Sequence, residues 1–155
     1  MSIDIVKNFF KSNNIDKDIF EFPVSSATVE LAAEAVGVEP ARIAKTLSFY
    51  TKEKDGAILI VTAGDRKIDN SKFKHFFGMK AKMLAPDDVE RLTGHAIGGV
   101  CPFGNPDTVT AYLDLSLKRF ETIFPAAGSS NSAVEMTCDE LEQYSHSKEW
   151  IDVCK

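Results

Sequence analysis

No run of apolar residues in this chain approaches the roughly 18 that a membrane-spanning helix requires, so we expect no contact with a membrane. Cysteine is scarce: Cys101, Cys138 and Cys154 are odd in number and widely spaced, which argues against a disulfide framework and against a CxxC metal or redox site. The HExxH, GxSxG and P-loop motifs are missing, and the three histidines lack metal-ligand spacing. We expect no metal and no cofactor. With reduced thiols and no signal peptide at the start of the sequence, we expect the protein in the cytoplasm.

Charge of one sign is concentrated in one segment. The whole chain carries −5, but residues 66–82 hold six basic side chains and one acid, so this basic segment carries +5 and the rest −10. A patch of this size can contact a few phosphates but cannot bind a duplex along its length. Lys72 and Lys74 are the candidate phosphate contacts, with an ordinary solvated helix and turn as the alternative.

Short helices and short strands are mixed along the chain. Hydrophobic periodicity and capping residues predict helices over 3–13, 28–37, 69–78 and 86–94 and from residue 137 onward. Strands are predicted at 19–22, 44–51, 57–63, 79–84, 108–113, 121–124, 133–136 and 150–153. Because regular βαβ alternation is absent, we predict the α+β class: one compact domain over residues 1–155, with a curved, mainly antiparallel mixed sheet flanked by helices.

Lys45 is out of place in its predicted strand. In the run AKTLSFYT, strand alternation puts Lys45 on the same face as Leu47 and Phe49. A lysine on an apolar face must extend to solvent, pair with an acid or face a cavity. The functional interpretation is a cation inside a pocket, aimed at an anionic or carbonyl-bearing ligand.

The stretch GHAIGGVCPFGNPDT, residues 94–108, is rich in glycine and proline but also apolar. Gly98 and Gly99 permit positive φ and a close approach of ligand to backbone, and Pro102 fixes the far side of the turn. Successive free amides in such a turn form a concavity that binds anions or carbonyl oxygens. The alternative for this stretch is a tight structural turn. The later turn PAAGSSNS, residues 125–132, also has two interpretations: its hydroxyls contact a ligand, or it is an ordinary hairpin loop.

Cys101 invites the hypothesis of a catalytic nucleophile. That role needs a base, ordinarily histidine, together with an orienting group. Nothing in the sequence places His75, His95 or His146 beside the thiol. We therefore interpret Cys101 as a small buried hydrophobic residue.

Taken together, RIAKTLSF, IGGVCPFG and the late AAGSS turn resemble the YbaK/EbsC-type aminoacyl-tRNA deacylases, the family that includes the editing domain of bacterial prolyl-tRNA synthetases. The resemblance runs from about Phe20 to Tyr144. It implies a compact mixed α/β fold, no metal and no covalent intermediate. It also implies hydrolysis of the ester that links a wrong amino acid to the 3′ end of a tRNA.

The resemblance also assigns roles to residues. The family's strand lysine falls on Lys45, which together with the backbone of Gly98 and Gly99 forms the expected catalytic set. The expected substrate-binding residues are Phe20, Val100, Cys101, Pro102, Gly128 and Ser129. Lys45 would anchor the terminal nucleotide, and the loop amides would hold the ester carbonyl and the attacking water.

One departure from the family pattern bears on the substrate. Members that act on cysteinyl-tRNA commonly carry Gly-Lys-Arg-Gly in the late turn, where this chain has Gly128-Ser129-Ser130-Asn131. The expected function is a free-standing deacylase for a mischarged tRNA, in particular tRNA for proline carrying a small wrong amino acid, with prolyl-tRNA synthetase as a candidate partner. The alternative is a non-catalytic module that uses the same pocket to bind a nucleotide or a tRNA end. The sequence leaves the oligomeric state open.

Overall fold

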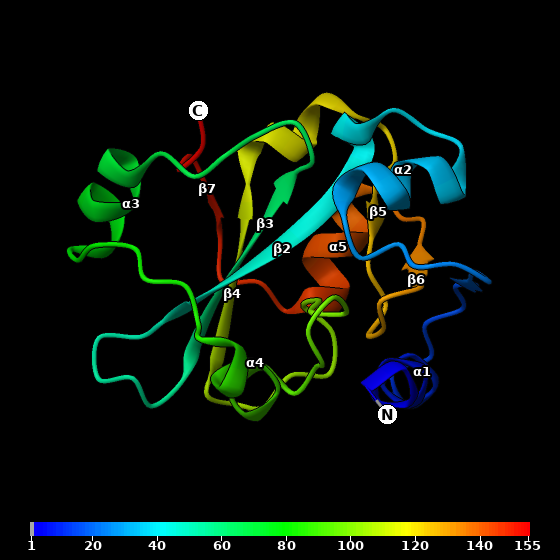
Figure 1. Cartoon of the computed structure of the whole chain (residues 1–155), viewed down its shortest axis with the longest axis horizontal. Coiled ribbons are helices and arrows are strands. Elements are labelled where there is room, and N and C mark those ends of the chain that lie inside the picture. Colours follow the sequence, from blue (N-terminus) through cyan, green and yellow to red (C-terminus); the bar gives the residue numbers. More distant parts are fainter. Residues whose placement is uncertain (1) are drawn as a thin grey trace.

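A five-stranded mixed sheet forms the centre of the computed structural model, which describes residues 2–155 (Figure 1). The strand order is β5-β2-β3-β4-β7, and β1 and β6 form a separate two-stranded sheet. The strands are β1 (Ile19–Glu21), β2 (Ile43–Tyr50), β3 (Ala57–Ala63), β4 (Val109–Asp114), β5 (Phe124–Pro125), β6 (Ser132–Val134) and β7 (Trp150–Ile151). The helices are α1 (Ser2–Ser12), α2 (Val29–Val36), α3 (Asn70–Phe77), α4 (Pro86–Thr93) and α5 (Cys138–Ser145), with short 3-10 turns at Pro40–Arg42 and Leu115–Arg119.

The predicted mixed sheet is confirmed, and its pairing can now be specified. β2 and β3 form an antiparallel hairpin, and β1 pairs antiparallel with β6. The contacts β2–β5, β3–β4 and β4–β7 are parallel. In the large sheet, the β2–β3 contact is therefore antiparallel and the other three strand contacts are parallel. The reason is that β3 reaches β4 through a long connection containing α3 and α4, and such a crossover permits parallel pairing.

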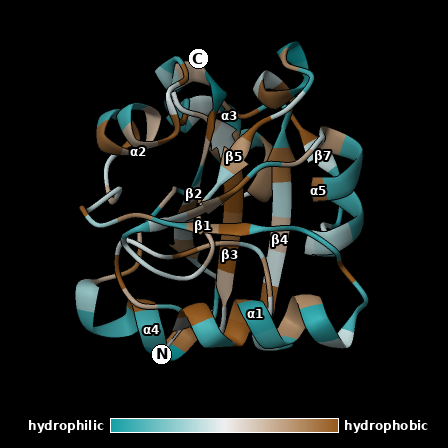
Figure 2. Cartoon of the chain, turned by 90° about the vertical axis from the view of Figure 1, so that its right-hand side faces the viewer, coloured by the Kyte–Doolittle hydropathy of each residue, from teal (hydrophilic) through white to brown (hydrophobic). Residues whose placement is uncertain are grey.

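Both faces of the sheet are covered. On one face, Val6 and Phe10 of α1 and Leu141 of α5 pack in one core cluster with Val61 and Leu113. On the other face, Phe73 of α3 packs with residues that include Phe49, Ile60 and Tyr112. Every residue of β3 is buried, as expected for a central strand covered on both sides. Figure 2 shows α1 lying across one end of the strands, with hydrophobic and hydrophilic residues alternating along it.

Local capping chemistry fixes the helix ends that the sequence predicts. The Thr28 hydroxyl accepts a hydrogen bond from the Leu31 amide at 3.1 Å, and Gly37 ends α2 with φ +75°. The Asp69 carboxylate accepts from the Ser71 and Lys72 amides at the start of α3. Thr137 and Glu140 form the predicted capping box of α5.

The predicted strand over 79–84 is wrong. Only Met83 forms a β-bridge there, with Phe49, while the Tyr50 amide donates to Lys82 O and the Leu84 amide to Ser48 O. Met79 and Ala81 pack against the core cluster around Phe73 instead. The segment reaches the edge of β2 only at residues 82–84. The apolar residues that alternate before that point serve to pack against the core rather than to form a strand.

No helix of residues 2–155 is long and apolar enough to cross a membrane.

Candidate functional site

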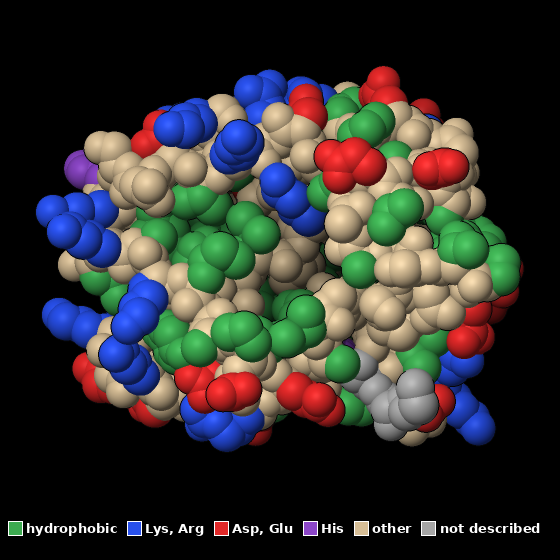
Figure 3. All heavy atoms as spheres, in the orientation of Figure 1, with side chains coloured by type: hydrophobic (Ala, Val, Ile, Leu, Met, Phe, Trp, Pro, Cys, Tyr) green, Lys and Arg blue, Asp and Glu red, His purple; other side chains and the backbone are tan. Residues whose placement is uncertain are grey.

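A cavity of about 290 Å³ opens beside β2 and brings together several of the predicted site residues. Lys45, Gly98 and Val100 line it, and Thr46 and Leu47 complete the β2 wall. The remaining walls are largely apolar or small and come from the start of β2, from α2 and the segment before it, from β5 and the residue after it, and from β6: Ser26, Ala27, Thr28, Val29, Ala32, Ile43, Ala44, Phe124, Ala126, Ser132 and Ala133. We call this space the Lys45 cavity. Figure 3 shows the molecular face hollowed near its middle, with hydrophobic side chains beside the hollow.

Lys45 is half-buried on the face of β2 that it shares with Leu47 and Phe49, as the alternation predicts. Its ammonium donates a hydrogen bond to the carbonyl oxygen of Arg66, which holds the side chain in place. Burial lowers the pKa of Lys45 below its ordinary value, while the nearby Cys154 and Asp65 side chains act in the opposite direction. An ammonium has three N–H donors, so this cation retains donors for a ligand.

The glycine loop is held close to the late turn. A Cβ on Gly99 would lie 2.5 Å from the Gly128 carbonyl carbon and the Ser129 nitrogen, so only glycine permits this approach. Gly98 has φ +88°, and a Cβ there would meet the Cβ atoms of Ser130 at 3.0 Å and Ala27 at 3.4 Å. The segments around residues 27, 98 and 129 therefore converge at the Lys45 cavity.

The loop amides are not equivalent as donors. The Gly99 amide is already used, because it donates to Ala96 O at 3.0 Å. Within residues 2–155, the amides of Gly98 and Val100 have no acceptor. Both residues line the Lys45 cavity, so the amides that are free to bind a ligand oxygen belong to Gly98 and Val100 rather than to the predicted pair Gly98 and Gly99.

The late turn contributes structure to this site. The Ser129 hydroxyl donates to Asn131 Oδ1 at 2.9 Å and is hydrogen-bonded to the Ser132 hydroxyl at 2.8 Å. The Ser26 amide donates to Ser130 O at 2.6 Å. Gly128 and Ser129 do not themselves line the cavity; their backbone packs against Gly99, while Ser130 O holds the segment before α2.

Cys101 is fully buried and lies outside the lining of the Lys45 cavity. Its sulfur is 3.6 Å from Nε2 of His95, a proximity that the sequence did not reveal. That nitrogen also lies 2.7 Å from the carbonyl oxygen of Phe103, so it carries the proton and donates there. Hence His95 Nε2 cannot accept a proton from the thiol. Burial raises the pKa of Cys101 to about 12 and lowers that of His95.

Other predicted residues lie apart from the cavity. Phe20 is 43% exposed on β1 and is paired with Ala133, which does line the cavity. Lys74 is exposed on α3. Lys72, on the same helix, already contacts Asp152 at 3.0 Å and the Cys154 carbonyl at 2.9 Å.

Thr46 is one of the cavity residues that sequence reasoning missed. Its hydroxyl oxygen is buried with no hydrogen-bond partner among residues 2–155, yet the residue lines the Lys45 cavity. The alternation places Thr46 on the face opposite Lys45, and a threonine in a strand carries no signal of a functional role. Its position became visible only once α2 and β6 were seen to enclose that side of β2.

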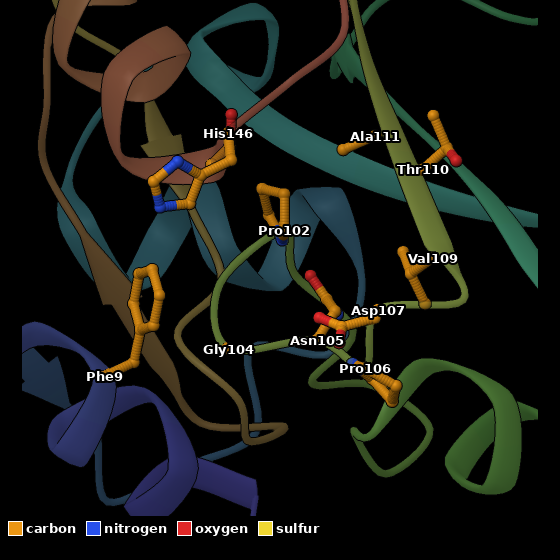
Figure 4. A pocket seen from close by; sticks show the side chains of 11 residues that line it. Phe9, Pro102, Gly104, Asn105, Pro106, Asp107, Val109, Thr110, Ala111 and His146 are labelled. Atoms are coloured by element: carbon orange, nitrogen blue, oxygen red, sulfur yellow. The ribbon is translucent and has the colours of Figure 1, made fainter.

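A larger cavity, of about 420 Å³, lies between α1, the loop 102–107, β4 and the end of α5 (Figure 4). Pro102 is its only wall residue from the predicted site, and Phe9 and His146 face each other edge-on across it. Nowhere in residues 2–155 do three or more His, Cys, Asp or Glu side chains form a group that could hold a metal ion.

Comparison with known proteins agrees with this geometry. The family model described as the aminoacyl-tRNA editing domain matches residues 24–144. YwhH of Bacillus subtilis is 57% identical over 155 residues, which is 100% of this chain and 98% of that protein. EbsC of Enterococcus faecalis, named provisionally as a Cys-tRNA(Pro)/Cys-tRNA(Cys) deacylase, is 30% identical over 79% of this chain and 74% of its own length. A crystal structure described provisionally as a trans-editing enzyme for prolyl-tRNA synthetase superposes with a TM-score of 0.89 at 30% identity, covering 99% of this chain and 97% of that one.

Proposed function

Because this chain belongs to the aminoacyl-tRNA editing domain family, we propose that it is a deacylase that hydrolyses the ester of a mischarged tRNA in trans. The observation that carries the proposal is the Lys45 cavity, where a held ammonium faces the same space as the free amides of Gly98 and Val100. An ester carbonyl and a nearby phosphate or ribose need this combination of donors. Since tRNA is charged in the cytoplasm, we place the protein there.

The residues have separate tasks in the proposed reaction. Water attacks the ester carbonyl carbon, and the negative charge that develops on the carbonyl oxygen is stabilised by the Gly98 and Val100 amides. Each such donor contributes about 2.7–4 kcal/mol in a dry site. The bond to the ribose oxygen then breaks, and that oxygen takes a proton, which releases the free amino acid and the intact tRNA. Lys45 holds the terminal nucleotide so that the ester lies against the loop.

No protein side chain in the cavity is suited to activate the water. Among the residues that line it, Lys45 is the only titratable one, and an ammonium that donates to Arg66 O is not a base. We therefore infer that the neighbouring ribose hydroxyl of the substrate assists the attack.

The cavity supports a small amino acid as the group removed. Apolar walls from α2, β2 and β5, with Val29, Ile43 and Phe124, favour a small uncharged side chain over a charged one. A synthetase pocket separates residues that differ by one methylene by only about 1–3 kcal/mol, so a second site for small errors is needed. We propose tRNA for proline as the substrate and prolyl-tRNA synthetase as a partner, on the strength of the names of EbsC and the superposed structure.

The test is ester hydrolysis across a panel of tRNAs for proline, alanine and cysteine, each charged with alanine, serine, cysteine or proline. We expect release of a small amino acid from tRNA for proline, unchanged by a chelator, and no release of proline. Tight binding of the tRNA end with no hydrolysis of any ester would instead support a non-catalytic binding module. Loss of turnover on chelation would refute the metal-independent mechanism.

A further inference from the structure

The turn that follows β3 supplies the acceptor for the Lys45 ammonium. The Arg66 amide donates to Ala63 O at 3.1 Å, which closes residues 63–66 into a β-turn, and the Arg66 carbonyl oxygen accepts from Lys45. We call residues 63–66 the acceptor turn. Because the ammonium is half-buried, its charge needs a fixed polar partner. The place of this cation in the Lys45 cavity therefore depends on where the acceptor turn is held.

An ion pair joins the acceptor turn to the 3-10 turn Leu115–Arg119. Arg119 Nη1 donates to Asp65 Oδ2 at 3.0 Å and Nη2 donates to Asp65 Oδ1 at 2.6 Å, so guanidinium and carboxylate form two parallel hydrogen bonds. Arg119 Nε donates to Ser116 O at 2.8 Å, which fixes the guanidinium against its own turn. The two side chains of the pair are 36% and 40% exposed. An ion pair this exposed adds little to global stability, so its main consequence is the geometry that it imposes.

The 3-10 turn is itself fixed to the core. The Asp114 carboxylate belongs to a residue that is 2% exposed, and it accepts from the Ser116 amide at 2.9 Å and from the Val153 amide at 3.0 Å. Ser116 Oγ in turn accepts from the Ala63 amide at 3.2 Å. The Arg119 side chain therefore extends to the acceptor turn from a backbone that is held in place.

The acceptor turn also packs tightly on its other side. A Cβ on Gly64 would lie 2.1 Å from Pro40 O and 2.7 Å from a methyl carbon of Val29, so only glycine permits this contact. Val29 also lines the Lys45 cavity. The carbonyl that Lys45 uses belongs to the residue directly after Asp65, so the hold of Arg119 on Asp65 acts one residue away from the acceptor.

We propose that Arg119 is a positioning residue for the deacylase reaction: through Asp65 it fixes the acceptor turn, and the Arg66 carbonyl then holds the Lys45 ammonium where the substrate needs it. This inference rests on the proposed function, because Lys45 anchors the terminal nucleotide there. Arg119 does not line the Lys45 cavity, and its effect on the reaction passes through Lys45 alone.

A direct contact with a tRNA phosphate is the other role open to an exposed arginine. The variant Asp65→Asn separates the two roles, because it frees the guanidinium of Arg119. A phosphate contact should then hold tRNA at least as tightly as before, whereas a positioning residue has lost its connection to the acceptor turn.

The first measurement does not depend on hydrolysis. NMR of the ¹⁵N-labelled full-length protein records the side-chain ammonium groups, and Lys45 is identified by the signal missing from Lys45→Met. We expect the Lys45 signal to shift or broaden in Arg119→Leu, in Asp65→Asn and in Arg119→Lys, which keeps the charge but cannot form both hydrogen bonds. The matched control is Arg91→Leu, which removes another arginine–aspartate pair, with Asp88 at 2.5 Å, and should leave the Lys45 signal unchanged.

The second measurement is kcat/KM on one mischarged tRNA and on a minimal aminoacyl-adenosine. Arg119→Leu and Asp65→Asn should lower kcat/KM at least fivefold on both substrates, because the terminal nucleotide that they share loses its fixed anchor. Arg91→Leu should leave both values unchanged. In a Lys45→Met background, Arg119→Leu should cause no further loss, since it acts through the missing ammonium.

Three outcomes would overturn the proposal: an unchanged Lys45 signal in the clamp variants Arg119→Leu and Asp65→Asn, full kcat/KM in both, or a loss on tRNA that is absent on aminoacyl-adenosine. The last would make Arg119 a phosphate contact. Should Arg119→Leu fail to fold, Asp65→Asn and Arg119→Lys carry the same test. An altered Lys45 signal, with no mischarged tRNA hydrolysed by the wild type, would instead remove the enzyme and leave the hold on Lys45 standing.

Discussion

Lys45 is a desolvated cation whose removal should affect activity and stability in opposite directions. Lys45→Ala should reduce kcat/KM for deacylation at least tenfold, because the terminal nucleotide loses its anchor. Lys45→Met keeps most of the stem volume and should lose activity to the same extent. Since burial disfavours the charged ammonium, the Tm of the Met variant should equal or exceed that of the wild type.

Steady-state kinetics on one mischarged tRNA, with thermal melts of both variants, check this prediction. Full turnover at saturating and subsaturating substrate in either variant would contradict the role of Lys45.

Cys101 should behave as a buried structural thiol. Cys101→Ser should keep most of the deacylase activity, and iodoacetamide at pH 8 should leave Cys101 unmodified in the folded protein. The physical reason is its complete burial and a pKa raised to about 12. A covalent aminoacyl adduct on Cys101, detected by mass spectrometry, would show that this view is mistaken.

The same thiol predicts a pH dependence of stability. Its pKa rises from an ordinary 9.0 to about 12 on folding, so between these values the unfolded chain releases a proton that the folded chain keeps. The free energy of unfolding therefore falls as pH rises above about 9, by up to roughly 1.4 kcal/mol per pH unit for this group. Chemical denaturation at pH 8, 9 and 10 should show a shallower decline in Cys101→Ala than in the wild type, and identical slopes would refute the assignment.

At the level of structural elements, the glycine loop and the late turn act as one unit. Gly99→Ala should destabilise the protein by about 1–3 kcal/mol, because its Cβ would overlap the backbone of Gly128 and Ser129. Activity should fall with it, since the loop must move away from the turn. Gly37→Ala is the matched control: it has φ +75° but open space around its Cβ, so it imposes backbone strain without a clash.

Denaturant unfolding and deacylation assays separate the two effects. We expect Gly37→Ala to lose stability but keep its kcat/KM. If Gly99→Ala and Gly37→Ala lost activity to a similar extent, the position of the glycine loop would not matter for turnover, and the loss would come from reduced stability alone.

Elements fixed by neighbours in the sequence were predictable, and those fixed by distant partners were not. Thr28, Asp69 and Thr137 cap their helices through contacts within three residues, so the sequence displays them directly. The segment 79–84 alternates like a strand, but whether it pairs depends on how far β2 is already covered. The parallel pairing of β3 with β4 likewise depends on how the connection of more than forty residues between them folds.

The candidate site shows the same division. Lys45 and Gly98 break local rules of a strand and a turn, and so both could be identified from the sequence. Thr46 breaks none, and the engagement of the Gly99 amide by Ala96 O is a detail of turn geometry. The proximity of His95 to Cys101 also depends on how the loop folds back on itself.

For the whole molecule, we expect the +5 of the basic segment 66–82 against the −10 of the rest of the chain to govern tRNA binding. Lys74→Ala should weaken tRNA binding and flatten the slope of log K against log salt by about 0.7–0.9, the contribution of one phosphate contact. Lys148→Ala, an exposed lysine outside the basic segment, should leave the slope unchanged. Hydrolysis of a minimal aminoacyl-adenosine should be unaffected by Lys74→Ala, because that substrate lacks the distal phosphates.

Lys72 should respond differently from Lys74 despite their proximity. Its ammonium joins α3 to Asp152 and to the Cys154 carbonyl, so Lys72→Ala should lower the Tm, whereas Lys74→Ala should not. Binding titrations at several salt concentrations, together with melting curves, measure both effects. If Lys72→Ala changed the salt dependence of tRNA binding without lowering the Tm, Lys72 would be a phosphate contact rather than a structural residue.

The pairing of the segment 67–69 with residues 153–155 has a consequence for biosynthesis. The Asp69 amide donates to Val153 O, Lys67 and Lys155 exchange backbone hydrogen bonds, and Ile68 bridges Cys154. On the ribosome, the segment 67–69 must wait for roughly 85 further residues before its partner exists, on the order of 4–17 seconds at about 5–20 residues per second. Lys45, whose ammonium donates to the carbonyl oxygen of Arg66 beside this segment, therefore gains its native surroundings only after residues 153–155 have been made.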